Sequence, residues 1–443
     1  MTPYMITFFV MVGVFMIGCF ALKWPVGVSM MAAAVIGGLE GMLAHGASFS
    51  QTITDLVRMM VEGEFGYIDT ILTIACAMIF MKVIEDSGAL DALSSLLIEK
   101  FHKLPAVLLI LIMFIIMFPG MITGSSTAAV LSAGSIMAPV LLLLGLDNVT
   151  AGSVIAMGGI LGMIAPPVNT AALVICAGID VPYVGFTGPL LLLTMPLAIL
   201  FVLMLGLPKI KNLDYEKLKP ALAKQDATRK EYGFKIYIPF LVLVVLMIFF
   251  KVIAAKIGVT DLGMPVIFLI SAAVGLFTGR KINPLKAVPA AIRTATPVMA
   301  ILMGVGMFIE LMTATGVRGF IVVTCLQMPE ALWLLACCIS IPLFGAVSSF
   351  GACSVLGVPF AYIYGTYLGG NVVVCLAAIS LIAAVGDMMP PTALAGLFAA
   401  QVTGVKKYTK ILVKCIIPII ILLVWAGFVL VNSKKYFAWS VFG

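Results

Sequence analysis

Two proline pairs interrupt long apolar stretches at corresponding places in the two halves of this chain. Pro166 and Pro167 stand in Gly-Met-Ile-Ala-Pro-Pro-Val-Asn-Thr, and Pro390 and Pro391 stand in Gly-Asp-Met-Met-Pro-Pro-Thr-Ala. Because proline lacks an amide hydrogen and clashes with the preceding turn, each pair predicts a break in a helix. Paired breaks in the two halves of an apolar chain are typical of the binding site of a secondary transporter.

The apolar stretches indicate a chain that crosses a membrane many times. Of the 443 residues, 63% are hydrophobic and 10% are charged, and the mean hydropathy is +1.22. Soluble domains carry about 25% charged residues. Since about 20 apolar residues cross a bilayer, the runs predict roughly ten to twelve spans and an all-α polytopic membrane protein.

The distribution of charge indicates orientation in a lipid bilayer and no nucleic-acid partner. The net charge is +7, and the only long polar segment, residues 209–235, holds eight basic residues against four acidic ones. Basic segments between spans stay on the cytoplasmic side, so we expect this linker to be cytoplasmic. The nine cysteines follow no CxxC or metal-ligand spacing, which argues against redox or metal chemistry.

The two halves match each other weakly at a nearly constant offset. Ser125 pairs with Ser349 and Pro166 with Pro390, both at the same offset (349 − 125 = 390 − 166 = 224). We interpret these matches as an internal duplication. The predicted organisation is a first repeat over residues 1–208, the cytoplasmic linker over residues 209–235 and a second repeat over residues 236–443.

We expect the two repeats to be inverted relative to one another. The second starts from the cytoplasmic linker, whereas the first carries its first charge only at Lys23 and is predicted to start outside. Inverted repeats let one site face alternate sides of a membrane. Two spans open each half and form the predicted scaffold: residues 5–21 and 25–44, and residues 236–255 and 262–278.

Each half also contains a second interruption, rich in glycine and serine, ahead of its proline pair. These are residues 119–127 (Pro-Gly-Met-Ile-Thr-Gly-Ser-Ser-Thr) and residues 345–352 (Gly-Ala-Val-Ser-Ser-Phe-Gly-Ala). Glycine beside small hydroxyl side chains favours a tight turn. We interpret each segment as a re-entrant hairpin, whose non-helical backbone must line a cavity or be buried in protein. The alternative is an unbroken helix that packs through its small residues.

A hairpin that faces a broken helix brings hydroxyl groups, carbonyl groups and helix N-termini together. Carbonyl and hydroxyl oxygens suit a hard cation such as Na⁺, and amide groups suit a carboxylate. No Lys or Arg falls in either hairpin or broken helix, so hydroxyls and dipoles would have to bind an anion. The alternative for each hydroxyl is a bond back to its own helix. The predicted substrate ligands are Ser126, Thr127, Asn169, Thr170, Ser348 and Thr392, and the predicted Na⁺ ligands are Gly124, Ser125, Pro166, Ser349, Gly351, Asp387 and Pro390.

Acidic residues inside apolar stretches are the other chemical candidates. Asp387 lies three residues before Pro390 and could ligate a cation or carry a proton, since intramembrane carboxylates are usually functional or paired. We interpret Glu85 and Asp86 as residues at the membrane surface. No nucleophile–base arrangement or phosphate loop occurs, so no enzyme activity is predicted. A membrane enzyme and a passive structural subunit are the rival interpretations from other classes.

The interrupted segments resemble those of one known family, the large membrane subunits of tripartite ATP-independent periplasmic (TRAP) transporters, or DctM-like permeases. The first hairpin segment and the two proline segments are similar to the corresponding motifs of that family. Individual motifs are short and apolar, but together they extend over nearly the whole chain. The segments that carry the resemblance are residues 22–27 (Leu-Lys-Trp-Pro-Val-Gly), 86–90 (Asp-Ser-Gly-Ala-Leu), 122–129 (Ile-Thr-Gly-Ser-Ser-Thr-Ala-Ala), 165–167 (Ala-Pro-Pro) and 389–391 (Met-Pro-Pro).

The resemblance implies an elevator, with a moving transport domain on a static scaffold, in the inner membrane of a bacterium. It implies Na⁺-coupled import of small organic anions such as dicarboxylates. It also implies two protein partners, a periplasmic substrate-binding protein and a small membrane subunit. Asn169 and Thr170 depart from the family pattern and resemble the Asn-Thr pairs of divalent-anion/sodium symporters, which need no binding protein. A standalone cation-coupled symporter or exchanger therefore remains the alternative.

Overall fold

The structure, a computed structural model, describes residues 2–210, 215–250 and 260–434, and the ordered elements in these ranges are helices without strands. The all-α prediction is thereby confirmed. The first half contains α1 (Pro3–Phe20), α2 (Val26–Ala44), α3 (Phe49–Gly66), α4 (Ile68–Ser87), α5 (Ala89–Phe101), α6 (Pro105–Thr123), α7 (Ser126–Ala129), α8 (Ser135–Leu143), α9 (Asn148–Ile164), α10 (Thr170–Gly178) and α11 (Thr187–Gly206). The linker is α12 (Tyr215–Tyr232), and the second half contains α13 (Ile238–Ile248), α15 (Gly263–Gly275), α16 (Pro284–Ala314), α17 (Val317–Leu326), α18 (Glu330–Gly345), α19 (Ser349–Ala352), α20 (Val358–Ala361), α21 (Val372–Ala384), α22 (Leu394–Thr403) and α23 (Thr409–Val431).

The lengths of the helices separate complete spans from interrupted ones. Within the described residues, eight helices are long and apolar enough to cross a membrane, and a ninth span results if α3 and α4, bent by 45°, count as one. The sequence-based number is higher because interrupted segments such as α9, α18 and α21 are apolar but only 10–17 residues long. At 1.5 Å per residue such helices do not reach across the hydrocarbon core, which is about 30 Å thick. Part of the predicted span at 236–255 lies outside the described residues.

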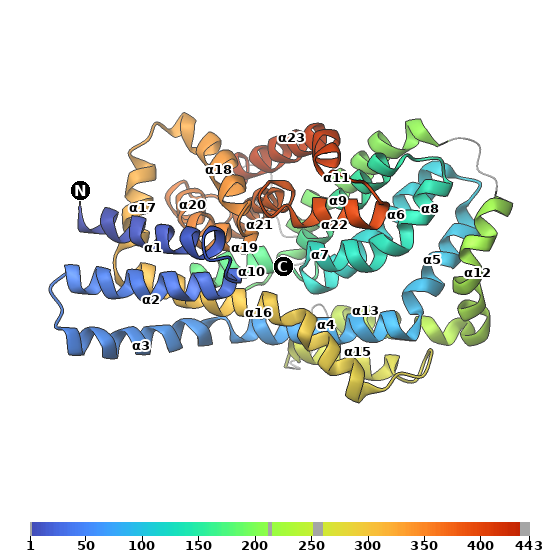
Figure 1. Ribbon diagram of the computed structural model, residues 1–443, viewed down its shortest axis with the longest axis horizontal. Helices are drawn as coiled ribbons and strands as arrows, with labels where there is room; N and C mark the ends of the chain where they lie inside the picture. Colours follow the sequence, from blue (N-terminus) through green and yellow to red (C-terminus); the bar gives the residue numbers. More distant parts are fainter. Residues whose placement is uncertain (1, 211–214, 251–259, 435–443) are drawn as a thin grey trace.

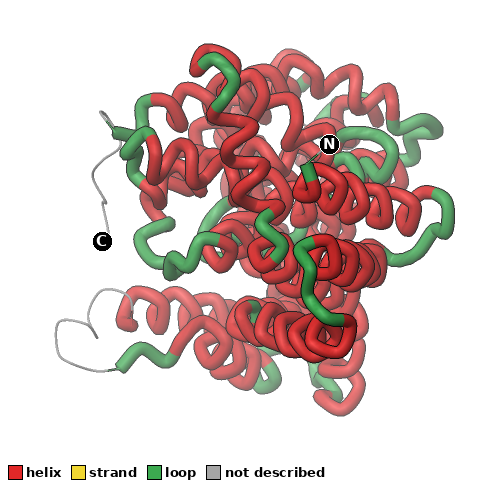
Figure 2. The backbone as a smooth tube through the Cα atoms, turned by 90° about the vertical axis from the view of Figure 1, so that its left-hand side faces the viewer, coloured by secondary structure: helices red, strands yellow, loops and turns green. Residues whose placement is uncertain are grey.

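The helices form two layers. Helices α2, α3, α4, α13, α15 and α16 lie along the lower part of Figure 1, and the interrupted helices lie above them; Figure 2 shows the same division from the side. The long helix α16 packs against α2, α3 and α4. These contacts depend on glycine, because a Cβ on Gly306 would lie 2.2 Å from the carbonyl oxygen of Gly63, and one on Gly304 would lie 2.6 Å from that of Gly27. Small residues at such positions let membrane helices approach closely.

Two aromatic pairs connect each half to the other. Phe15 of α1 stacks on Phe344 of α18 with ring centroids 5.6 Å apart. Phe118 of α6 meets Phe240 of α13 edge-on at 5.3 Å. The first helix of each half therefore contacts a helix in the interrupted region of the opposite half.

The linker helix α12 packs against α5 at one end of the molecule, at the right of Figure 1. Arg229 forms an ion pair with Glu99, and Ser95 donates a hydrogen bond to Asp226. These polar contacts join the linker to the first half. The predicted boundaries of the repeats and their opposite orientation in a membrane stay predictions.

Candidate functional site

The first hairpin consists of α6, α7 and α8, with its turn at Gly124 and Ser125. Helix α6 ends at Thr123, and Gly124 adopts the left-handed conformation (φ 63°, ψ 25°), which glycine tolerates best. Ser125 is extended, and its hydroxyl accepts a hydrogen bond from the amide of Ala128 at 3.3 Å, which caps α7. The two arms pack against each other, so the chain reverses here. Both arms are long enough to cross a membrane, and the re-entrant course stays a prediction.

The second hairpin consists of α18, α19 and α20, with its turn at residues 346–348. Ser348 is extended (φ −160°, ψ 118°), and its hydroxyl accepts from the amide of Gly351 at 3.1 Å. Gly351 is therefore in the first turn of α19 and not in the bend. Ser348, and not Ser349, is the counterpart of Ser125, because these two serines cap the helices that follow the turns. The pairing of Ser125 with Ser349 was therefore wrong by one position.

Each proline pair breaks its helix beside the hairpin of the same half. The backbone is not helical between α9 and α10, and the amide of Val168 donates to the carbonyl of Met121 at 3.1 Å. In the second half both the amide and the hydroxyl of Thr392 donate to the carbonyl of Ala346, at 3.2 and 2.7 Å. Hydrogen-bonding groups exposed by each break are thus satisfied by hairpin carbonyls.

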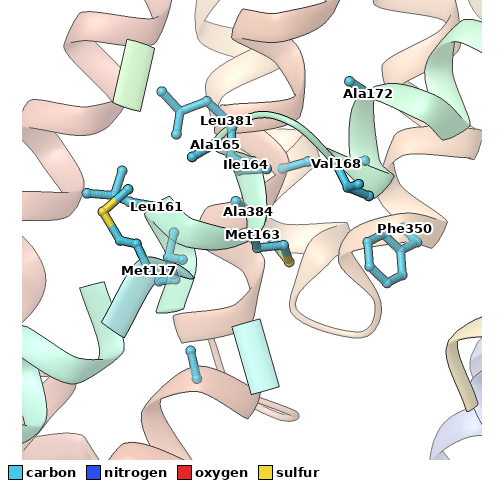
Figure 3. Packing of buried hydrophobic residues seen from close by; sticks show 14 of the residues in the cluster. Met117, Leu161, Met163, Ile164, Ala165, Val168, Ala172, Phe350, Leu381 and Ala384 are labelled. Atoms are coloured by element: carbon cyan, nitrogen blue, oxygen red, sulfur yellow. The ribbon is translucent and has the colours of Figure 1, made fainter. Parts of the chain in front are cut away.

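Apolar side chains surround the first break. Met117, Leu161, Ile164, Val168 and Leu381 are each at most 1% exposed, and Figure 3 shows them around the segment that connects α9 to α10. The non-helical backbone is therefore buried in protein, which is the condition for such backbone at membrane depth.

Asp387 is the point at which the two hairpins converge. Its carboxylate accepts hydrogen bonds from Ser126, in the first hairpin, and from Ser349, in the second. The two serines bond to different carboxylate oxygens, and Asp387 is only 6% exposed. Among the described residues no Lys, Arg or His forms an ion pair with this carboxylate. A buried carboxylate held by hydroxyls alone can accept a cation or a proton.

A cavity of about 720 Å³ lies beside Asp387 and is lined by both hairpins and by helices of the lower layer, α2, α4 and α16. Seven of the thirteen predicted site residues line it: Ser125, Ser126, Thr127, Ser348, Ser349, Asp387 and Thr392. The other six do not line it: Gly124, Pro166, Asn169, Thr170, Gly351 and Pro390.

Asn169 is buried, and both ends of its side-chain amide form hydrogen bonds. Its side-chain oxygen accepts from the amide of Ala172 at 2.9 Å, which caps α10, and its side-chain nitrogen donates to the hydroxyl of Ser380 at 2.8 Å. Ser380 belongs to α21, so the amide joins the broken helices of the two halves. This geometry gives Asn169 a positioning role, and we do not assign it to substrate contact.

Thr170 has a buried hydroxyl without a hydrogen-bond partner among the described residues. The side chain is 0% exposed, and it faces the first hairpin turn, because a Cβ on Gly124 would lie 2.1 Å from its oxygen. Buried hydroxyls normally have partners. Thr170 is one of the predicted substrate ligands, but an orphan oxygen beside an irregular turn also suits Na⁺, since hard cations take oxygen ligands.

The cavity also has charged residues that the sequence reasoning did not place there. Glu85 and Lys82 line it from α4, and the position of Glu85 relative to the membrane surface stays a prediction. Asp86, in contrast, pairs with Lys82 at 2.7 Å. The spacing of Lys82 and Glu85 places both on one helix face within an apolar run, and that pattern was the available signal. No group of three or more His, Cys, Asp or Glu that could hold a metal ion occurs in the described part of the chain.

Two solved structures have a similar fold. The YdaH transporter of Alcanivorax borkumensis matches with a TM-score of 0.62 at 15% identity, over 89% of this chain and 91% of that one. MtrF of Neisseria gonorrhoeae, described with a class of antimetabolite efflux pumps, matches with a TM-score of 0.59 at 14% identity, over 87% and 85%. At this identity the likeness shows the fold alone. A search of curated protein sequences gives no match.

The sequence model of one family matches residues 3–434, almost the full length of the chain. That family is described as the DctM component of tripartite ATP-independent periplasmic transporters. It is a family of transporters and not of enzymes, and its members are the large components of systems that also have a small subunit and a binding protein. The predicted resemblance is confirmed: this chain is a multi-pass membrane protein that belongs to the DctM family of TRAP transporter components.

Proposed function

We propose that this chain is the large permease subunit of a TRAP system in a bacterial inner membrane and imports small organic anions together with Na⁺. The observation that carries the proposal is the convergence of both hairpins on Asp387 at the edge of a cavity of about 720 Å³. A periplasmic binding protein would deliver the substrate, and a small membrane subunit would accompany the chain.

The charges around the cavity support cation coupling. Its lining contains one cation, Lys82, and three acidic residues, Glu85, Asp91 and Asp387. Asp91 forms an ion pair with Arg280 at 3.8 Å, so the excess of negative charge comes from the other two. An anionic substrate alone would add to this excess of negative charge in a poorly solvated site, where like charges repel strongly. A cation bound with the substrate reduces the repulsion, and by linkage each then raises the affinity for the other. The orphan oxygen of Thr170 offers one Na⁺ ligand next to the first hairpin turn.

The two-layer arrangement supports an elevator mechanism. The cavity lies between the hairpins and the lower layer, so movement of the upper layer along the lower one would carry the site across the membrane. We assign α1–α4, α13, α15 and α16 to the scaffold, and α6–α11 and α18–α23 to the moving domain. The predicted scaffold spans of each half are included in this assignment.

Uptake into proteoliposomes tests the function. The chain is reconstituted with a small membrane subunit and a binding protein, and uptake of labelled organic acids is measured under a Na⁺ gradient or a pH gradient. We expect uptake that depends on Na⁺ and is lost in Asp387→Asn. The control Cys337→Ala, a buried residue away from the cavity, should retain normal uptake. Uptake that ignores Na⁺ in the parent chain would contradict the proposal.

The alternative is a standalone proton-coupled symporter or exchanger. It is favoured by one observation, that among the described residues Asp387 is bonded only to hydroxyls, an environment in which a carboxylate can carry a proton. Under this alternative, a pH gradient would drive transport by the chain alone, and omission of the binding protein would have no effect.

A further inference from the structure

The lining of the central cavity has a chemical character that restricts the substrate. Apolar side chains from both layers form much of its wall, among them Met81 and Ile301 from the lower layer and Phe350 and Phe398 from the upper layer. Binding sites for small molecules combine such apolar walls with a few placed polar groups that fix the orientation of the ligand. The uncharged polar groups of this lining are hydroxyls, most of them at the two hairpins.

Two of these hydroxyls suit one carboxylate. Ser125 and Ser348 accept hydrogen bonds from the helices that they cap, and in the described structure neither is shown to donate its own hydroxyl hydrogen. Both side chains line the cavity, one from each hairpin turn, and each is 8% exposed. A hydroxyl that already accepts can still donate, so the pair can supply two hydrogen bonds to a carboxylate between the hairpins.

A second carboxylate would find no unpaired cation among the described residues that line the cavity. Lys82 is the only cation of the lining within the described residues, and its ammonium is already bonded to Asp86 at 2.7 Å. The remaining charged residues of the lining are acidic. Burying an unpaired charge is costly, and a site that lacks a partner for a polar group rejects ligands that carry it.

We propose that the cavity selects monocarboxylic acids with an uncharged apolar body, branched or aromatic, over dicarboxylic acids. The carboxylate binds between Ser125 and Ser348, and the body lies against Phe398 and Ile301. This inference rests on the proposed function, because it names the substrate class of the same site.

Binding to the permease itself tests the proposal without the selectivity of a binding protein. The chain with its small subunit is placed in lipid nanodiscs, and its Kd is measured in Na⁺ and in choline for three acids that share one head group. These are 2-oxo-4-methylpentanoate, with an apolar branched body; pyruvate, with almost no body; and 2-oxoglutarate, with a second carboxylate. We expect Na⁺-dependent binding in which the first acid binds at least about tenfold tighter than either of the others.

Substitutions in the cavity wall distinguish the loss of a substrate contact from a loss of folding. Phe398→Ser should weaken binding of 2-oxo-4-methylpentanoate about tenfold and leave pyruvate unchanged, since one apolar group in a pocket changes affinity by roughly 10–200-fold. Leu397→Ser is the matched control, because Leu397 is 42% exposed and does not line the cavity. Ile301→Arg adds a cation to the wall and should improve binding of 2-oxoglutarate, a gain that misfolding cannot produce.

The outcomes distinguish this inference from the function on which it rests. Na⁺-dependent binding in which 2-oxoglutarate is equal to or tighter than the branched acid overturns the inference and leaves the proposed function intact. Tighter binding of leucine, which adds an ammonium group to a similar body, also overturns it. If neither these acids nor succinate bind in the presence of Na⁺, both the inference and the proposed function are overturned.

Discussion

At the scale of single residues, Asp387 holds the two hairpins in one arrangement. Ser126 and Ser349 occupy the first position of the helices that follow the two turns, and each donates to a different oxygen of the carboxylate. Hydrogen bonds to charged groups contribute about 1.5–3 kcal/mol each. The carboxylate therefore fixes the relative position of two segments that belong to opposite halves of the sequence.

Removal of either serine hydroxyl should affect both stability and ion dependence. We expect Ser126→Ala and Ser349→Ala each to lower the free energy of unfolding by about 1.5–3 kcal/mol and to raise the Na⁺ concentration for half-maximal uptake several-fold. The reason is that the carboxylate loses one of the two donors that orient it. Thermal unfolding and Na⁺ titration of uptake measure the two effects. Ser153→Ala is the control, because the hydroxyl of Ser153 donates within its own helix, to Val149.

The orphan hydroxyl of Thr170 gives a second prediction at this scale. Without Na⁺, Thr170→Val should be as stable as the parent or more stable, by up to about 1–3 kcal/mol, because a buried unpaired hydroxyl is replaced by a methyl group. Stabilisation by Na⁺ should be lost in the same variant. Thr194→Val is the matched control, since Thr194 donates to Leu190 in its own helix. A normal Na⁺ response in Thr170→Val would exclude this oxygen as a ligand.

The hydroxyl residues of the site were easier to predict from the sequence than the charged residues that line the cavity opposite them. Ser126 and Ser349 were identifiable because small hydroxyl residues beside glycine stand out in apolar runs. Lys82 and Glu85 share one helix face within an apolar run, but the sequence did not show that this face meets the cavity, because that depends on packing between distant segments. The bond from Asn169 to Ser380 was not predictable for a related reason, since Ser380 lies in the other half.

At the scale of elements, each hairpin and the broken helix of its half form one unit joined by backbone contact. A Cβ on Gly162 would lie 2.5 Å from the carbonyl oxygen of Met117, and one on Gly386 would lie 2.3 Å from the carbonyl carbon of Gly345. The two glycines are related by the same offset as the proline pairs (386 − 162 = 390 − 166), so the close approach occurs at matching places in both halves. The close approach thus keeps the hairpin carbonyls near the backbone groups that each proline break leaves without a helical partner.

Substitution of these glycines should separate the helices. We expect Gly162→Ala and Gly386→Ala each to lower the free energy of unfolding by at least about 1–3 kcal/mol, because the new methyl group meets backbone that cannot move aside. Gly319→Ala in α17 is the control, since nothing lies within 4 Å of a Cβ there and alanine favours a helix. Thermal unfolding in detergent measures all three. Equal stability of Gly386→Ala and Gly319→Ala would contradict the close contact.

The positions of the breaks were predictable at this scale, and their exact register was not. Proline pairs and Gly-Ser turns interrupt helices for local reasons, so both sets of breaks appear near the expected residues. The off-by-one pairing of Ser125 arose because the length of a turn depends on how its two arms pack, which no local pattern encodes. The predicted end of the span at 236–255 falls outside the described structure.

At the scale of the whole molecule, the proposed elevator requires the upper layer to move past the lower one. Phe118 on α6 and Phe240 on α13 meet across this boundary, with ring centroids 5.3 Å apart. Phe80 on α4 and Phe268 on α15 meet at 6.0 Å within the lower layer. The two pairs are similar in distance and differ in whether they would separate during transport.

Cross-linking of these pairs tests the movement. In the variant Phe118→Cys/Phe240→Cys, oxidation should stop transport almost completely, and a reductant should restore it. Oxidation of Phe80→Cys/Phe268→Cys should leave transport unchanged, and the oxidised parent chain controls for the nine native cysteines. Uptake by proteoliposomes is the measurement. Full uptake by a fully cross-linked Phe118→Cys/Phe240→Cys protein would exclude sliding at this boundary.

The exchange of aromatic contacts between the halves has a consequence for how the chain is made. Phe118 leaves the ribosome long before its partner Phe240, because more than a quarter of the chain is synthesised between them. At synthesis rates of about 5–20 residues per second, the first hairpin waits on the order of ten seconds for the helix that will support it. During that interval the face of α6 that carries Phe118 has not yet met its partner in α13.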